Sequence, residues 1–243
     1  MKLNPSNQLE LLIHGNVLKN LIFLYQKDKL PNKILLKGQK GIGKSTLAYH
    51  LINFVLSKNE DFPYDIDHFK IDEKNRSFKL INNGSSPNFF LIDIQADKKN
   101  INIDQIRNII QDLNKSSLNN KPKFVLIDNS EYLNKNSINV LLKEIEEPND
   151  NIYFILIQNQ KTLLSTLTSR FVKFNISLTN KESNYVINKL INEDIHNLVS
   201  GDFINYYFSP GNIYRMIDFC DENNIDLKKI ELKDFINILI KDN

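Results

Sequence analysis

The sequence is poor in the residues that mark several protein classes. It has one Cys, no Trp, seven Gly and seven Pro among 243 residues. A collagen-like chain needs far more glycine and a disulfide-stapled chain needs paired cysteines, so both classes are excluded. Cys220 can form neither an internal disulfide nor a zinc site, and it is expected to be a small buried apolar side chain. The cysteine content therefore predicts a protein of the reducing cytoplasm.

Charge of one sign and long apolar runs are also scarce. The formal net charge is +2, too small by itself to indicate a nucleic-acid or anionic-membrane partner. No stretch approaches the roughly 18 uncharged apolar residues that a membrane span needs. The N-terminal segment carries Pro5 and Glu10 and lacks the pattern of a signal peptide. We therefore expect a soluble protein with no membrane partner.

Short apolar segments alternate with amphipathic segments along the first 176 residues. The apolar segments are rich in β-branched and aromatic residues, which predicts strands, and the amphipathic segments have helical spacing. Predicted strands cover residues 33–36, 89–94, 123–127, 152–157 and 172–175. Predicted helices cover residues 9–25, 45–56, 103–113 and 137–145. This alternation is typical of a doubly wound α/β domain, with a parallel sheet covered by helices on both faces.

Two regions depart from the alternation. Residues 59–87 mix polar residues, glycine and serine with few periodic positions, which predicts a partly irregular insertion. After residue 177 the strand signals stop, and predicted helices cover residues 180–191, 203–207, 213–219 and 232–240. We therefore expect an α/β domain over residues 1–176 and a small helical domain over residues 177–243.

The motif with the most chemistry is a phosphate-binding loop. The sequence GQKGIGKS matches the pattern G-x-x-x-x-G-K-[ST] and lies between a predicted strand and a predicted helix. Glycines permit the tight turn that lets backbone N–H groups approach phosphates. Lys44 can reach the β- and γ-phosphates, and the Ser45 hydroxyl is a candidate ligand of Mg²⁺. The candidate ATP-binding residues are Gly38, Gly41, Ile42, Gly43, Lys44, Ser45 and Thr46; a glycine-rich turn without a ligand is the alternative.

A second acidic element follows the strand at residues 123–127. Asp128 ends this apolar run and is expected to face the phosphate loop and hold Mg²⁺ through water; capping of the next segment is the alternative. In hydrolysing ATPases of the AAA+ type the next residue is typically a Glu that polarises the attacking water, but here it is Asn129. An amide can orient water but cannot accept its proton. Glu131 lies past the strand end and is expected to point away, so we expect nucleotide binding with little or no hydrolysis.

Several blocks together resemble one family. The blocks are LLIHGNVLKNL and LPNKILLKGQKGIGKSTLA, then INIDQIR at 101–107, LNKNSINVLLKEIEEP at 133–148, LSTLTSR at 164–170 and SPGNIYRMI at 209–217. In content and order they resemble the delta-prime subunits of DNA polymerase III, members of the bacterial clamp-loader family. The resemblance implies an AAA+ domain followed by a helical lid.

The resemblance also implies residue roles and partners. Arg170 matches the family arginine that reaches into the ATP site of a neighbouring subunit, where a guanidinium stabilises charge on the γ-phosphate; a plain surface charge is the alternative. Lys143, Glu146 and Glu147 read as a solvated helix end before Pro148, and only the resemblance suggests that they face another subunit or DNA. The implied partners are the gamma/tau and delta subunits, the sliding clamp and primer-template DNA.

The sequence departs from the family at several positions. Phe171 stands where the family has Cys, and a zinc-binding Cys cluster is missing, so no zinc is expected. The arginine that hydrolysing relatives carry near Ser209 is missing, and Arg215 is a poor substitute. The C-terminal helical collar domain is expected to be short or missing.

Two functions remain open from the sequence. The first is a delta-prime-like clamp-loader subunit that binds nucleotide, hydrolyses it weakly or not at all, and donates Arg170 to a neighbour. The alternative is a self-sufficient ATPase motor of the gamma/tau type, for which Glu131 is the nearest water-activating carboxylate.

Overall fold

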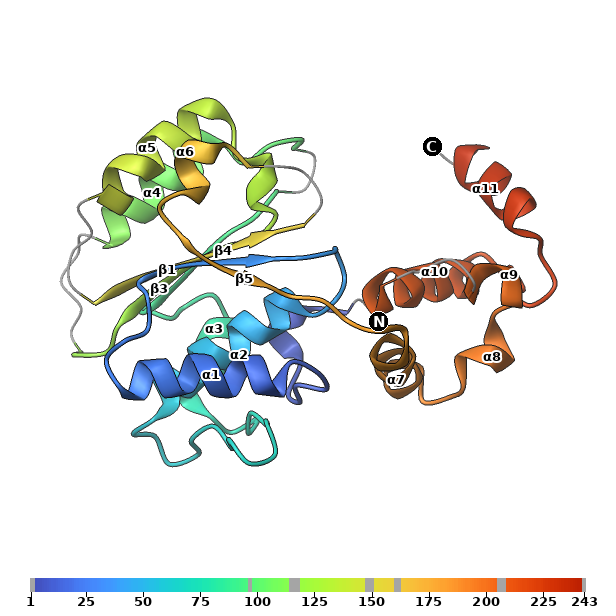
Figure 1. Cartoon of the computed structure of the whole chain (residues 1–243), viewed down its shortest axis with the longest axis horizontal. Helices are drawn as coiled ribbons and strands as arrows, with labels where there is room; N and C mark the ends of the chain where they lie inside the picture. The colour runs from blue at the N-terminus through green and yellow to red at the C-terminus, as the bar shows by residue number, and fades with distance from the viewer. Residues whose placement is uncertain are drawn as a thin grey trace. The chain divides into compact units, whose positions relative to one another are not determined.

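The computed structural model divides the chain into two compact units (Figure 1). It describes residues 3–95, 98–113, 119–146, 151–159, 163–204 and 209–241. One unit, the α/β unit, consists of Asn4–Gly38 and Gly43–Ile176. The other, the helical unit, consists of Met1–Leu3, Gln39–Ile42 and Ser177–Asn243.

A parallel sheet of five strands forms the centre of the α/β unit, in the order β2-β3-β4-β1-β5. The strands are β1 (Lys33–Lys37), β2 (Phe89–Ile92), β3 (Lys123–Ile127), β4 (Ile152–Gln158) and β5 (Val172–Asn175). All pairs are parallel, and β1 lies between β4 and β5. The predicted α/β class and all five strands are confirmed, although β2 ends two residues earlier than expected.

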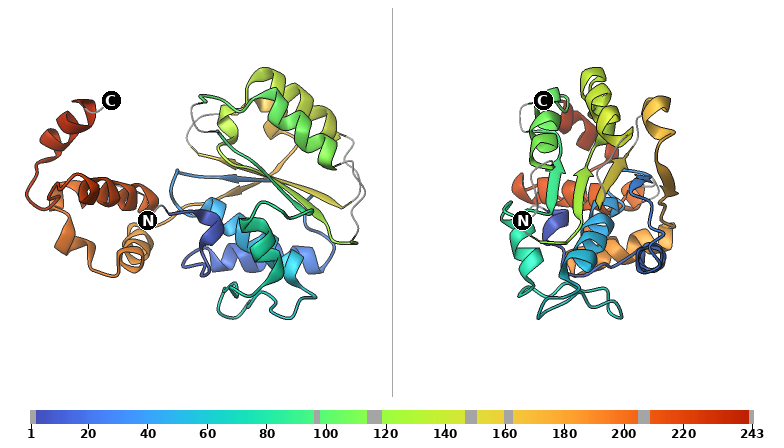
Figure 2. Two further views of the ribbon diagram at one scale, coloured as in Figure 1. Left: turned by 180° about the vertical axis from the view of Figure 1, so that it is seen from behind. Right: turned by 90° about the vertical axis from the view of Figure 1, so that its left-hand side faces the viewer.

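Helices cover both faces of this sheet. One face carries α1, α2 and α3 and the other carries α4, α5 and α6, as Figures 1 and 2 show from opposite sides. Their bounds are α1 (Gly15–Gln26), α2 (Lys44–Ser57), α3 (Arg76–Asn82), α4 (Ile103–Leu113), α5 (Lys135–Glu146) and α6 (Ser165–Thr168). Two single-turn 3₁₀ helices, η1 (Pro5–Asn7) and η2 (Ser130–Tyr132), complete the unit's described helices.

The core explains why the strands are nearly continuously apolar. Alternate residues of a strand point to opposite faces, and here both faces are covered. Leu35, Val125 and Leu156 belong to a buried cluster shared with Ile106 and Leu141 of the helices α4 and α5. Their strand neighbours, such as Leu126 and Ile155, are also fully buried. A sheet buried on both faces leaves the strand ends as the place for polar chemistry.

The predicted helix over residues 9–25 is wrong in its first turns. The helix begins at Gly15, and His14 before it has a left-handed φ of 68°. Residues 9–11 instead pair with the segment near residue 70: the Leu11 N–H donates to Phe69 O at 3.0 Å, and the Ile71 N–H donates to Leu9 O at 2.8 Å. Apolar periodicity alone does not reveal this pairing, because the partner segment lies about sixty residues further along the chain.

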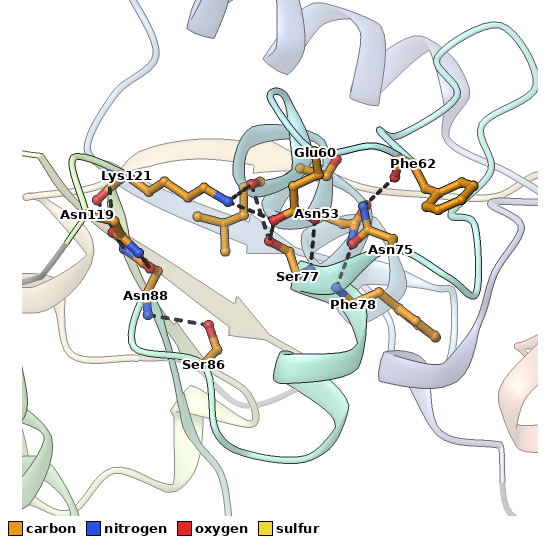
Figure 3. Close-up of polar contacts among 12 residues, drawn as sticks. Asn53, Glu60, Phe62, Asn75, Ser77, Phe78, Ser86, Asn88, Asn119 and Lys121 are labelled. Atoms are coloured by element: carbon orange, nitrogen blue, oxygen red, sulfur yellow. Dashed lines mark hydrogen bonds and ion pairs between the residues drawn. The ribbon is translucent and has the colours of Figure 1, made fainter.

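The region 59–87, predicted as partly irregular, contains α3 and a polar network that attaches it to the rest of the unit (Figure 3). The Asn75 side chain caps α3 by accepting from Phe78 N–H at 2.7 Å. Glu60 accepts from the Ser77 hydroxyl at 2.6 Å and from the Lys121 ammonium at 2.7 Å. Lys121 also donates to Leu56 O at the end of α2. Polar side chains therefore anchor this insertion where apolar ones are few.

Burial and hydrogen bonds act in opposite directions on Glu60. Burial favours the neutral acid, but the hydrogen bonds from Lys121 and Ser77 outweigh it and lower the pKa of the Glu60 carboxyl. The carboxylate is therefore the stable form in the folded protein, and the ion pair with Lys121 is largely shielded from solvent on the Glu60 side. Shielding of this kind makes such a pair less sensitive to salt than a surface pair.

His50 lies on the buried face of α2 and connects this helix to two other segments of the chain. Its Nε2–H donates to Gln8 O at 3.1 Å, so Nδ1 is free to accept from the Tyr64 hydroxyl at 2.8 Å. The ring is completely buried, and this burial lowers the pKa of His50 to about 4. His50 is therefore neutral in the folded protein at physiological pH.

We expect His50 to make the protein less stable as the pH falls. The unfolded chain takes up a proton near pH 6.5 and the folded chain only near pH 4. The stability that His50 contributes is thus complete above pH 6.5, and about 3 kcal/mol is lost as the pH falls to about 4. Denaturant titrations of the wild type and of His50→Gln across this range measure the difference. Equal pH slopes for the two proteins would contradict the assignment.

The helical unit contains five helices in its described part. They are α7 (Asn180–Ile191), α8 (Ile195–Leu198), α9 (Gly201–Ile204), α10 (Pro210–Glu222) and α11 (Leu232–Lys241). Thr179 and Glu182 form a capping box at the start of α7. The predicted helix 203–207 is displaced: α9 ends at Ile204, and the remainder lies outside the described residues. Cys220 is buried with Phe203 and Phe235 in the core of this unit, as expected.

Among the described residues, no helix combines the length and the apolar character that crossing a membrane would require.

Candidate nucleotide-binding site

The phosphate loop connects β1 to α2. Gly41 and Gly43 have φ angles of 83° and 88°, a region that only glycine enters at no steric cost. α2 begins at Lys44, directly after the left-handed Gly43. The loop therefore leads into a helix N-terminus, where backbone N–H groups and the helix dipole favour an anion. Ile42 is buried, and Thr46 is half-buried on the first turn of α2.

Lys44 is buried within this loop. Its side chain is 3% exposed, and its ammonium donates to the carbonyl of Gly38 at 3.0 Å. A lysine ammonium is a compact group with three N–H donors, which is the kind of group that binds phosphate oxygens. The loop thus contains a lysine of the type that a phosphate site requires.

Ser45 and Asp128, predicted together from separate motifs, are in contact. The Ser45 hydroxyl donates to Asp128 Oδ2 at 2.5 Å, across 83 residues of sequence. Asp128 follows β3 immediately and is partly buried. Burial is the largest influence on this carboxyl and raises its pKa, and the charge of Asp93 adds to the rise. A hydroxyl and a carboxylate are hard oxygen ligands, so this pair fits a Mg²⁺ ion.

Asn129 makes a polar bridge at the same edge of the sheet. Its Nδ2 donates to Asp93 Oδ1 at 2.8 Å, and its Oδ1 accepts from Asn159 Nδ2 at 3.0 Å. Its backbone is left-handed, with φ of 49°, which asparagine tolerates better than most residues. The amide expected from the sequence is therefore held between a carboxylate and a second amide.

Glu131 does not point away from this edge as expected. Its carboxylate accepts from the backbone N–H of Asn159 at 3.2 Å. The Asn159 side chain in turn contacts Asn129. Glu131 thus lies beside the polar bridge, because the short helix η2 turns the chain back toward the end of β4.

Asp93 and Asn159 are site residues that the sequence analysis missed. Each follows directly after a strand, Asp93 after β2 and Asn159 after β4. Parallel strands with neighbouring carboxyl ends bring such residues together. The sequence does place a polar residue after each of these apolar runs. The predicted strand extended to residue 94, however, so Asp93 was assigned to the strand and not to the position after it.

Arg170 lies away from this edge and is accessible. It follows α6 and precedes β5, and its side chain is 36% exposed. The guanidinium forms an ion pair with Glu146 of α5 and donates to Thr166 O at 2.6 Å. Phe171, the next residue, is buried in the sheet core. The buried Phe171 anchors the backbone while Arg170 extends to the surface.

Comparisons with known proteins place this chain in a family. The family model described as "DNA polymerase III, delta subunit" matches residues 13–180, more than half of the chain. The chain belongs to the DNA polymerase III delta-subunit family. This match includes the phosphate loop, the polar bridge and Arg170.

Two curated relatives and one solved structure extend this result. The delta-prime subunit of Bacillus subtilis is 31% identical over 160 residues, covering 65% of this chain and 46% of that protein. The gamma/tau subunit of Mycoplasma genitalium is 28% identical over 179 residues, covering 71% of this chain and 28% of that protein. The Thermotoga maritima RuvB Holliday junction branch migration motor has a TM-score of 0.51 at 18% identity, covering 92% of this chain and 69% of that one.

The comparisons confirm the delta-prime-like resemblance and the AAA+ fold. At 18% identity the likeness to RuvB concerns the fold alone. The chain spans about half the length of the curated delta-prime relatives that it matches. Within this delta-subunit family member, Lys143 and Glu146 are exposed on α5, whereas Glu147 and Pro148 lie outside the described residues.

Proposed function

We propose that this protein is a delta-prime-like subunit of a replicative clamp loader that binds ATP with Mg²⁺, hydrolyses it weakly or not at all, and lends Arg170 to a neighbouring subunit. The observation that carries the proposal is the pairing of a complete phosphate loop with an amide after Asp128. Such a site has the groups for binding but not the group for turnover.

The proposed ATP site uses the loop and the first turn of α2. Backbone N–H groups of the loop surround the phosphates, the Lys44 ammonium contacts their oxygens, and Ser45 and Asp128 hold Mg²⁺. Bound Mg²⁺ would supply positive charge that offsets the negative charge of the phosphates. The buried ammonium and the 2.5 Å contact between Ser45 and Asp128 support these roles. The proposed residues are Gly38, Gly41, Ile42, Gly43, Lys44, Ser45, Thr46 and Asp128.

The low hydrolysis follows from Asn129. A general base must accept the proton of the attacking water, and an amide has no such capacity. Both ends of the Asn129 amide are moreover engaged, with Asp93 and with Asn159. The chemical contribution of the chain is therefore proposed to lie elsewhere, at Arg170.

The proposal for Arg170 is supported by its surroundings. Leu164 and Val172, close to Arg170 in the chain, are 45% and 48% exposed. Exposed apolar side chains beside an accessible arginine are a composition common in protein interfaces. A guanidinium supplied from a neighbour stabilises the charge that develops on a transferring phosphoryl group.

The proposed assembly consists of gamma/tau and delta subunits, with the sliding clamp and primer-template DNA reached through it. The family match and the likeness to a gamma/tau subunit support this set of partners.

The cytoplasm is the proposed location. Residues 1–176 are proposed as the AAA+ domain and residues 177–243 as the lid, and the division of the chain into two units supports this boundary.

The test of the proposed site compares binding and turnover in the isolated chain. We expect the purified protein to bind a fluorescent ATP analogue in the presence of Mg²⁺ and to show negligible steady-state hydrolysis. Rapid turnover by the isolated chain, or no detectable binding, would contradict the proposal.

A self-sufficient motor of the gamma/tau type is the second candidate, because Glu131 lies at the same sheet edge as Asn129. A water-activating carboxylate contributes about 10²–10⁴ in rate. If Glu131 had this role, Glu131→Gln would remove the hydrolysis of the isolated chain while ATP binding survived. Under our proposal, Glu131→Gln leaves the already negligible rate unchanged and the binding intact.

A further inference from the structure

The polar bridge at Asn129 connects the ends of three neighbouring strands. Asp93 directly follows β2, Asn129 is the second residue after β3, and Asn159 directly follows β4. The contact distances are 2.8 Å from Asn129 Nδ2 to Asp93 Oδ1 and 3.0 Å from Asn159 Nδ2 to Asn129 Oδ1. An ionised carboxylate only accepts hydrogen bonds, so Asp93 requires the NH₂ end of the amide. The orientation of the Asn129 side chain is therefore determined by Asp93.

Negative charge surrounds this amide. Asp93 contacts it directly, Asp128 precedes it in the chain, and Glu131 lies beyond Asn159. Two carboxylates at hydrogen-bond distance repel each other unless they share a proton. A carboxylate at position 129 would meet Asp93 across the 2.8 Å that a hydrogen bond now occupies.

We propose that Asp93 is a positioning residue that restricts position 129 to a neutral amide. The inference rests on the proposed function and deepens it. The nucleotide site has no water-activating carboxylate at position 129 because the carboxylate of Asp93, which follows β2, would repel it. The amide after Asp128 and the carboxylate of Asp93 then form a matched pair.

An isosteric exchange tests the pair. Asn and Asp have nearly the same shape, so Asn129→Asp and Asp93→Asn change the charge and the hydrogen-bonding groups with little change in volume. Thermal unfolding is measured for the wild type, both single variants and the double variant, at neutral pH without nucleotide. We expect Asn129→Asp to lower the Tm by about 4 °C. Adding Asp93→Asn restores at least half of this loss, because one amide and one carboxylate again face each other.

ATP binding by the wild type is measured in parallel with the fluorescent analogue. Rescue of the Tm by the double exchange supports the inference, because a role limited to packing predicts that the two single effects simply add. Additive losses in the double variant overturn it. If Asn129→Asp alone fails to fold, recovery of the fold in the double variant supports the inference and continued failure overturns it.

The result separates this inference from the proposed function. Recovery of the Tm in the double variant, without ATP binding by the wild type, supports the role of Asp93 and refutes the nucleotide site. ATP binding by the wild type, without recovery of the Tm in the double variant, supports the nucleotide site and refutes the role of Asp93.

Discussion

Replacing Arg170 by alanine is expected to slow ATP hydrolysis at the neighbouring subunit's site by about 10³-fold. A guanidinium supplied in trans contributes roughly 10³–10⁵ in rate by stabilising charge on the γ-phosphate. The measurement is the clamp-dependent ATPase of a reconstituted loader in which that neighbour is the hydrolysing subunit. Assembly is verified by the mass of the intact complex, so that a lower rate cannot be assigned to loss of the subunit.

Three variants determine whether the effect belongs to the guanidinium. Arg170→Lys keeps the charge but loses the planar fork, so it is expected to recover only part of the rate. Arg76→Ala removes an exposed arginine from α3 of the same unit and should leave the rate unchanged. Glu146→Gln breaks the surface ion pair of Arg170, and because such pairs contribute about 0–1 kcal/mol, it should change the rate by less than about fivefold. A full rate with Arg170→Ala would contradict the proposal.

Replacing Lys44 by alanine is expected to weaken ATP binding by at least about 100-fold. The ammonium is buried beside the loop, and its hydrogen bonds to phosphate oxygens would be charge-assisted, each worth about 1.5–3 kcal/mol. Two such bonds account for at least a 100-fold change, since about 1.4 kcal/mol corresponds to a factor of ten. Titration of the fluorescent ATP analogue into the wild type and the variant measures this ratio.

The control for Lys44 comes from the same loop. Lys40 is exposed, so Lys40→Ala removes a positive charge of the loop without removing the buried ammonium, and only a small loss of affinity is expected. Thermal unfolding of Lys44→Ala without nucleotide shows whether the buried side chain is also needed for folding. Equal affinities of Lys44→Ala and Lys40→Ala would exclude the phosphate-binding role of Lys44.

The local sequence was sufficient to predict the strands and to locate the phosphate loop and the residues after Asp128. A strand buried on both faces must be a short, continuously apolar run, and five such runs match β1 to β5 within two residues at each end. The loop is similarly local, because eight consecutive residues contain the glycines, Lys44 and Ser45. Asn129 and Arg170 were also identified from their immediate neighbours and from the family resemblance.

Only the tertiary structure decided which distant residues meet. The strand order brings the ends of β2, β3 and β4 side by side, and this adjacency adds Asp93 and Asn159 to the site. The start of α1 at Gly15 likewise depends on a pairing with residues near 70, and Lys121 meets Glu60 across 61 residues. Periodicity reports what a residue's own neighbours favour, whereas these contacts depend on loop closure and strand order, which no local pattern contains.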